Sequence, residues 1–128
     1  MHVAALQLDI VWENKPANHD KVRRLLSSAR PLPGTLVVLP EMFATGFSMN
    51  VSTITDDDGT TQQFLADIAR EYRVNVLAGI VRKEHNEAVW YDTEGREVDR
   101  YAKVHLFSHA GETQHFLAGT GPRVWDCD

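Results

Sequence analysis

Residues 36–43 of the chain read Leu36-Val37-Val38-Leu39-Pro40-Glu41-Met42-Phe43. Four consecutive aliphatic residues, with Gly34 before them and a proline after them, are typical of a short buried strand. Pro40 has no N–H to donate to a neighbouring strand, so we expect pairing to end there. Glu41 therefore comes just after the carboxyl end of a central strand, where open α/β sheets carry their chemistry.

The carboxylate of Glu41 has apolar neighbours in the sequence, namely Met42, Phe43 and Phe47. An apolar environment suits a carboxylate to general acid–base work near neutral pH. The alternative is an ordinary turn glutamate, and this stretch alone favours neither interpretation over the other.

The composition is that of one soluble globular domain. The chain has 128 residues, 43% hydrophobic and 24% charged, which is enough for one core and too little for two domains. A net charge of −5 without a basic patch argues against a nucleic-acid partner. A single cysteine allows no internal disulfide and favours a cytoplasmic location. Neither a membrane-spanning stretch nor a signal peptide is expected.

Predicted strands and helices alternate along the chain. Residues 3–8, 36–39 and 74–81 are expected to be strands, and residues 17–29 a helix with apolar side chains three and four apart. Thr60 or Thr61 is expected to cap a second helix, after an acidic run at residues 56–58 that we interpret as solvated surface. Residues 88–91 and 97–101 flank a turn and are expected to pair as a hairpin. This order predicts an α/β layered sheet.

The second stretch that carries chemistry follows the hairpin and reads Arg100-Tyr101-Ala102-Lys103-Val104-His105-Leu106-Phe107. A lysine among aromatic and aliphatic residues is unusual unless its ammonium is paired or functional. A partly buried ammonium beside a reacting carbonyl could stabilise an oxyanion. The alternative is that Lys103 merely extends into solvent from an edge strand.

These two stretches resemble two of the three signatures of the nitrilase superfamily of carbon–nitrogen hydrolases. The first corresponds to residues 39–43 with Gly46 and Phe47, and the second to residues 101–107. The order of strands and helices is also similar to that family over essentially the whole chain. Residues 108–112, with Phe116 and Gly119, resemble the omega-amidase-like branch.

The resemblance implies an αββα sandwich that hydrolyses nonpeptide amides or nitriles through a Glu-Lys-Cys triad, without a cofactor. By that resemblance Glu41 would be the general base and Lys103 the oxyanion stabiliser. Glu112 would match a second glutamate that positions the lysine or the substrate. The expected partner is a small amide, such as an omega-amide of a dicarboxylic acid, and members of the family also tend to associate into homo-oligomers.

The third signature is a cysteine at the end of a further apolar strand, and here the chain departs from the family. Cys127 precedes an acidic residue, but the only apolar residues just before it are the pair Val124-Trp125, where the family has a strand. A penultimate residue is also usually too frayed to hold a nucleophile in place. We therefore expect residues 1–128 to be the N-terminal half of a longer hydrolase domain, with the nucleophile beyond Asp128, and to be inactive alone. The link at residues 83–87 is also shorter than in the family.

Two other functions fit parts of the sequence. His105 and His109 are four residues apart, with Glu112 and His115 close behind, so a metal-dependent hydrolase is a rival enzyme. Because no sustained helical face carries these residues, we expect no metal there. The second alternative is a non-catalytic α/β module that binds a small molecule or a partner chain, since half a sandwich would expose an apolar sheet face.

Overall fold

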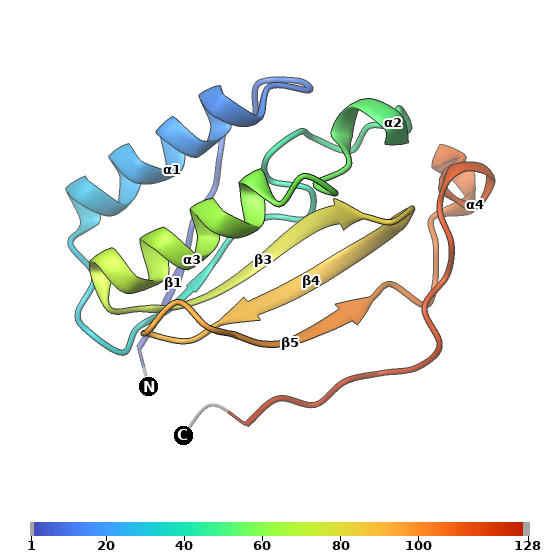
Figure 1. The fold of residues 1–128 in the computed structure, drawn as a ribbon. Helices are drawn as coiled ribbons and strands as arrows, with labels where there is room; N and C mark the ends of the chain where they lie inside the picture. Colours follow the sequence, from blue (N-terminus) through green and yellow to red (C-terminus); the bar gives the residue numbers. More distant parts are fainter. Residues whose placement is uncertain (1, 127–128) are drawn as a thin grey trace.

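Helices cover one face of a five-stranded sheet (Figure 1). The computed structural model describes residues 2–126. Its strands lie in the order β1 (Val3–Ala5), β2 (Leu36–Val38), β3 (Asn75–Arg82), β4 (His85–Tyr91) and β5 (Glu97–Ala102). The helices are α1 (Lys15–Ala29), α2 (Val51–Ile54), α3 (Thr60–Tyr72) and α4 (Glu112–His115), with a 3₁₀ turn at Ser108–Ala110. The predicted α/β class is confirmed. Within residues 2–126, no helix has the length and apolar character that a membrane span requires.

The predicted elements are present, but their ends differ. The first strand pairs with β2 over only three residues and ends at Ala5, not at residue 8. The strand expected at residues 88–91 also begins earlier, at His85. Lys83 and Glu84 have φ angles of 48° and 61° and form a tight turn, so β4 begins at His85 and the link belongs to a long hairpin. A two-residue hairpin turn with positive φ is usually signalled by Asn or Gly, and neither is present.

The strand directions bring distant segments to one edge of the sheet. β1, β2 and β3 run parallel, and β4 and β5 continue as an antiparallel meander. The carboxyl ends of β2 and β5 therefore lie at the same edge as the start of β4. Glu41 follows β2, Asn86 is the second residue of β4, and Lys103 follows β5. Asn86 and Lys103 meet Glu41 although they are 45 and 62 residues away in the chain.

The main apolar core lies between the sheet and the helices α1 and α3, which pack against each other (Figure 1). Its fully buried members include Val22, Leu26, Val37, Phe43, Leu65, Ile68, Val76 and Val89. A smaller cluster of Met42, Ile54, Val81 and Phe116 lies beside it. Met42 and Phe43 pack into these two clusters and so anchor the turn that carries Glu41, whose own side chain is 49% exposed.

A buried aspartate, not a threonine, caps helix α3. The side chain of Asp56 accepts hydrogen bonds from the backbone N–H groups of Thr61 (2.7 Å) and Gln62 (2.9 Å), in the first turn of the helix. Lys15 pairs with the same carboxylate at 3.4 Å. Asp56 is only 1% exposed, so the predicted threonine cap is wrong, and the acidic run is not solvated at its first residue. A buried carboxylate at a helix N-terminus satisfies N–H groups that have no partner within the helix.

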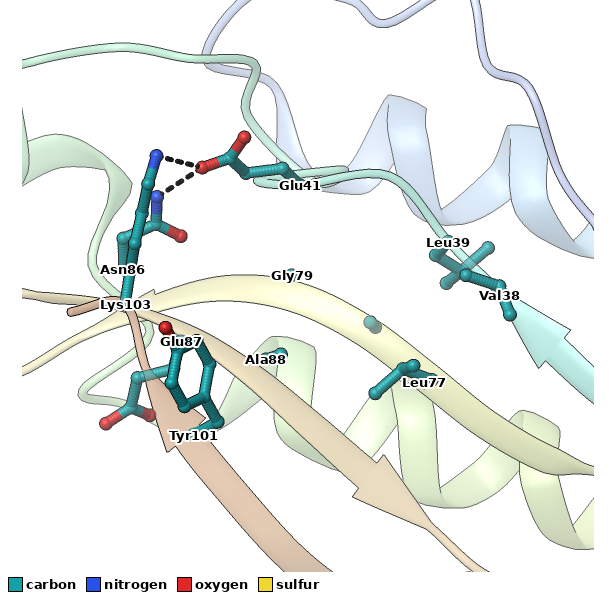
Figure 2. A pocket seen from close by; sticks show the side chains of 11 residues that line it. Val38, Leu39, Glu41, Leu77, Gly79, Asn86, Glu87, Ala88, Tyr101 and Lys103 are labelled. Atoms are coloured by element: carbon teal, nitrogen blue, oxygen red, sulfur yellow. Dashed lines mark hydrogen bonds and ion pairs between the residues drawn. The ribbon is translucent and has the colours of Figure 1, made fainter. Parts of the chain in front are cut away.

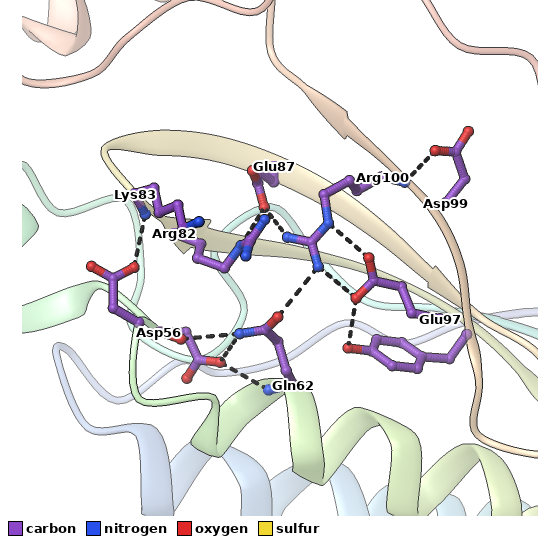
Figure 3. Close-up of polar contacts among 10 residues, drawn as sticks. Asp56, Gln62, Arg82, Lys83, Glu87, Glu97, Asp99 and Arg100 are labelled. Carbon is purple, nitrogen blue, oxygen red and sulfur yellow. Dashed lines mark hydrogen bonds and ion pairs between the residues drawn. The ribbon is translucent and has the colours of Figure 1, made fainter.

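A polar network joins α3 to the outer strands (Figure 3). Arg100 of β5 donates to Glu87 of β4 at 2.7 Å and to Gln62 of α3 at 3.3 Å. Burial opposes the charge of the guanidinium, but its hydrogen bonds to Glu97 and Glu87 outweigh that effect, and the pKa of Arg100 is raised. The network holds β5 against β4 and α3, and so fixes the strand that leads into Lys103.

His19 makes stability depend on pH. Its ring stacks on Phe64 with centroids 4.2 Å apart, and Nε2 lies 3.2 Å from the hydroxyl of Thr61. Burial, aided by the charges of Lys15 and Arg23 and opposed by Asp56, lowers the pKa of His19 from 6.5 to about 4. The unfolded chain therefore binds more protons than the folded chain between these values, so protonation favours unfolding.

We expect the free energy of unfolding to fall as pH drops from 6.5 towards 4, by about 1 kcal/mol per pH unit from this residue. Replacing His19 by glutamine should remove this contribution. The free energy of unfolding of the variant should then differ less between pH 6.5 and pH 4 than that of the wild type. Urea unfolding at several pH values measures it, and replacement of the exposed His105 by glutamine is the control. Equal slopes in wild type and His19→Gln would contradict the assignment.

Candidate active site

Glu41 stands on a tight turn that packs directly on strand β3. A Cβ atom at Gly79 would lie 2.6 Å from the Cα atom of Glu41, so only glycine permits this approach. The turn is tied to the strand by two hydrogen bonds of 3.3 Å. The N–H of Phe43 donates to the carbonyl of Gly79, and the N–H of Gly79 donates to the carbonyl of Pro40. Gly79 and these two hydrogen bonds thus fix the position of Glu41 at the edge of the sheet.

Lys103 bridges two carboxylates. Its Nζ donates to Oε1 of Glu41 at 2.8 Å and lies 2.9 Å from Oε2 of Glu112. The ring of Phe47 covers the ammonium, with its centroid 5.3 Å from Nζ. The side chain is 25% exposed and is paired on both sides, so Lys103 is not an isolated surface lysine.

Glu112 is the fully buried member of this group. It opens helix α4 and is 0% exposed, and its Oε2 accepts the backbone N–H of Phe107 at 2.5 Å. Its Oε1 accepts from the side-chain amide of Asn86 at 2.8 Å. Burial opposes the charged form of this carboxylate, but the hydrogen bonds from Asn86, Phe107 and Lys103 outweigh it, and the pKa of Glu112 is lowered.

The charges of the site are mutually stabilising. Burial alone would lower the pKa of Lys103, but its hydrogen bonds to Glu41 and Glu112 raise it instead. The lysine is therefore an ammonium near neutral pH, between two acceptors. Glu41 differs from Glu112 in that 49% of its side chain is exposed. Of the two carboxylates, only Glu41 is accessible to a reacting group.

The group borders two hollows. The first, of about 240 Å³, lies over the sheet face opposite the helices and is shown in Figure 2. Its lining is mostly apolar, and the polar residues that contribute to it are Glu41, Asn86, Glu87, Tyr101 and Lys103. The second, of about 530 Å³, is lined by Glu41, Phe47, Lys103, His105, Leu106 and Phe107. Glu41 and Lys103 thus stand between two spaces that a small molecule can enter.

The structure brings the three predicted site residues Glu41, Lys103 and Glu112 together, and adds Asn86. This asparagine is 4% exposed and contacts both glutamates, but the sequence analysis did not single it out. The only signal available was a polar residue inside what proves to be strand β4. Cys127 lies outside the described residues.

The two histidines considered as metal ligands are both exposed. His109 belongs to the 3₁₀ turn and His105 precedes that turn, so their spacing of four does not correspond to one helical face. Among residues 2–126, no three or more His, Cys, Asp or Glu side chains come together as a metal site.

Comparison with known proteins gives a consistent result. The family model described as carbon-nitrogen hydrolase matches residues 2–127. The 2-oxoglutaramate amidase of Bacillus subtilis is 29% identical over 98% of this chain and 51% of its own length. An omega-amidase (YafV) of Yersinia enterocolitica is 31% identical over 97% of this chain and 49% of its own length. The chain thus spans about half the length of the curated relatives it matches.

Solved structures agree with the sequence relatives. The CN-hydrolase superfamily protein XC1258 of Xanthomonas campestris, solved with an arsenic adduct in its active site, superposes with a TM-score of 0.83. It is 29% identical, and the match covers 94% of this chain and 48% of that protein. An amidase from Nesterenkonia has the same fold, with a TM-score of 0.79 at 20% identity. Sequence, fold and family model agree along the chain, which belongs to the carbon-nitrogen hydrolase family.

Proposed function

We propose that residues 1–128 form the N-terminal part of an amidase that hydrolyses a small nonpeptide amide through a cysteine thiol. The single observation that carries the proposal is the ammonium of Lys103, paired with the half-exposed Glu41 at the rim of two hollows. Cys127 lies outside the described residues, and the proposed nucleophile comes from chain beyond residue 128. This division is supported by the chain's coverage of only about half of its relatives.

In the proposed reaction the thiol gives its proton to Glu41 as its sulfur attacks the amide carbonyl. The carbonyl oxygen gains negative charge, which the ammonium of Lys103 stabilises. Glu41 then returns the proton to the leaving nitrogen, ammonia departs, and an acyl thioester remains. In the second half Glu41 takes a proton from water, which attacks the thioester and releases the acid and the thiol. In each half-reaction Glu41 gives up the proton that it accepted. The leaving nitrogen receives it in the first half, and the sulfur of the departing thiol receives it in the second.

The relatives support a class of substrate. Two of the relatives named above are a 2-oxoglutaramate amidase and an omega-amidase. We therefore propose an omega-amide of a dicarboxylic acid as the substrate.

Ammonia release from short dicarboxylic monoamides tests this function in the full-length polypeptide. We expect turnover that is abolished by thiol alkylation, no release from peptide amides, and no release from residues 1–128 alone. Absence of ammonia from every monoamide would overturn the proposed substrate class. Turnover that survives complete alkylation would overturn the thiol mechanism.

A further inference from the structure

The side-chain amide of Asn86 lies between the two glutamates, and Figure 2 shows its contact with Glu41. Its Nδ2 donates to Oε1 of Glu41 at 2.6 Å and to Oε1 of Glu112 at 2.8 Å. The backbone carbonyl of Asn86 also accepts the N–H of Lys103 at 2.8 Å. One buried residue at the start of β4 therefore holds both carboxylates and the backbone of the lysine.

The orientation of this amide is determined by its neighbours. Ionised carboxylates only accept hydrogen bonds, and an amide nitrogen has two hydrogens to donate. The opposite orientation would point the amide oxygen at the two carboxylates and leave both without this donor. Asn86 and Lys103 thus bridge the same pair of carboxylates. Asn86 does so through a neutral amide and Lys103 through a charged ammonium.

The two carboxylate oxygens of Glu41 differ in the hydrogen bonds that they accept. Both Asn86 and Lys103 donate to Oε1. Within residues 2–126, no hydrogen bond is made to Oε2. A carboxylate oxygen that accepts no other hydrogen bond is the more available of the two for an incoming proton.

We propose that Asn86 is a positioning residue, which holds Oε1 of Glu41 and so presents Oε2 to the proton of the nucleophile. This inference rests on the proposed function, because it assigns a role within that reaction. An amide is suited to the position because it supplies two donors without adding charge. A second cation there would favour the charged carboxylate more strongly and weaken Glu41 as a base.

Replacing Asn86 by alanine in the full-length polypeptide should lower kcat about 10- to 100-fold, with KM changed less than about threefold, as for other groups that orient reacting residues. Loss of a donor disfavours the charged base, so the acid limb of the pH profile of kcat should move to higher pH. Asn86→Asp, which places a third carboxylate beside Glu41 and Glu112, should move it further.

Asn18 provides a matched control. It is also buried, and its amide donates to the backbone carbonyls of Val11 (2.8 Å) and Ala44 (2.7 Å) and not to Glu41 or Glu112. Asn18→Ala should lower the melting temperature without moving the acid limb. If Asn86→Ala keeps the wild-type acid limb, and its activity falls only with the folded fraction as in Asn18→Ala, the positioning role is overturned.

A readout independent of turnover separates this inference from the proposed function. With ¹³C-labelled glutamate, NMR titration follows the carboxyl of Glu112, whose pKa should rise in Asn86→Ala because one of its donors is lost. An unchanged titration overturns the inference even if the enzyme is an amidase. A raised pKa without any ammonia release from the wild type supports the Asn86 bridge and overturns only the proposed function.

Discussion

Replacing Glu41 by glutamine in the full-length polypeptide should lower turnover on a small amide by about two to four orders of magnitude, the usual contribution of a general base. The carbonyl oxygen of glutamine can still accept from Lys103 and Asn86, as Oε1 of Glu41 does. Its NH₂ group then stands in place of Oε2 and cannot take a proton. The local geometry is kept and only the base is lost.

The fold should survive this change. The side chain of Glu41 is half exposed, and the turn is held by its buried neighbours Met42 and Phe43 and by Gly79 beneath it. We expect the melting temperature to change by no more than a few degrees. Glu94→Gln, at an exposed turn, is the control and should keep full activity. Wild-type turnover in Glu41→Gln would reduce Glu41 to a turn residue.

Much of the site could be predicted because its parts follow strand ends. Glu41 comes after an apolar run that stops at a proline, and Lys103 comes after the second strand of a predicted hairpin. Strands that run in the same direction end at the same edge of a sheet. That Glu41 and Lys103 act together was implied by the resemblance to the nitrilase superfamily, and the structure places Nζ of Lys103 2.8 Å from Oε1 of Glu41.

What could not be predicted depends on register and on long-range contact. Asn86 reaches the site only because a turn at Lys83 and Glu84 sets the β3–β4 pairing, and neither residue is a usual turn former. A shift of one residue would point its side chain to the other face of the sheet. The cap formed by Asp56 could not be predicted for a similar reason. Nothing in the neighbouring sequence distinguishes the buried carboxylate of Asp56 from the two solvated carboxylates that follow it.

Replacing Lys103 by methionine should lower turnover about a hundredfold or more, the scale of losing one oxyanion donor. Methionine keeps the length and apolar contacts of the stem but carries no charge. Attack on an amide concentrates negative charge on the carbonyl oxygen, so a fixed ammonium stabilises the transition state more than the neutral substrate. Lys103→Arg should also be poor, because a planar guanidinium does not reproduce a point charge between Glu41 and Glu112.

Stability distinguishes catalysis from packing at this position. Lys103→Met leaves the buried Glu112 without its cation, which should cost about 1–3 kcal/mol and lower the melting temperature. The double variant Lys103→Met/Glu112→Gln removes that unpaired charge and should regain much of the melting temperature while remaining inactive. Ammonia release and thermal unfolding of both variants measure the two effects separately. If turnover instead returns together with the melting temperature, Lys103 acts on the fold and not on the oxyanion.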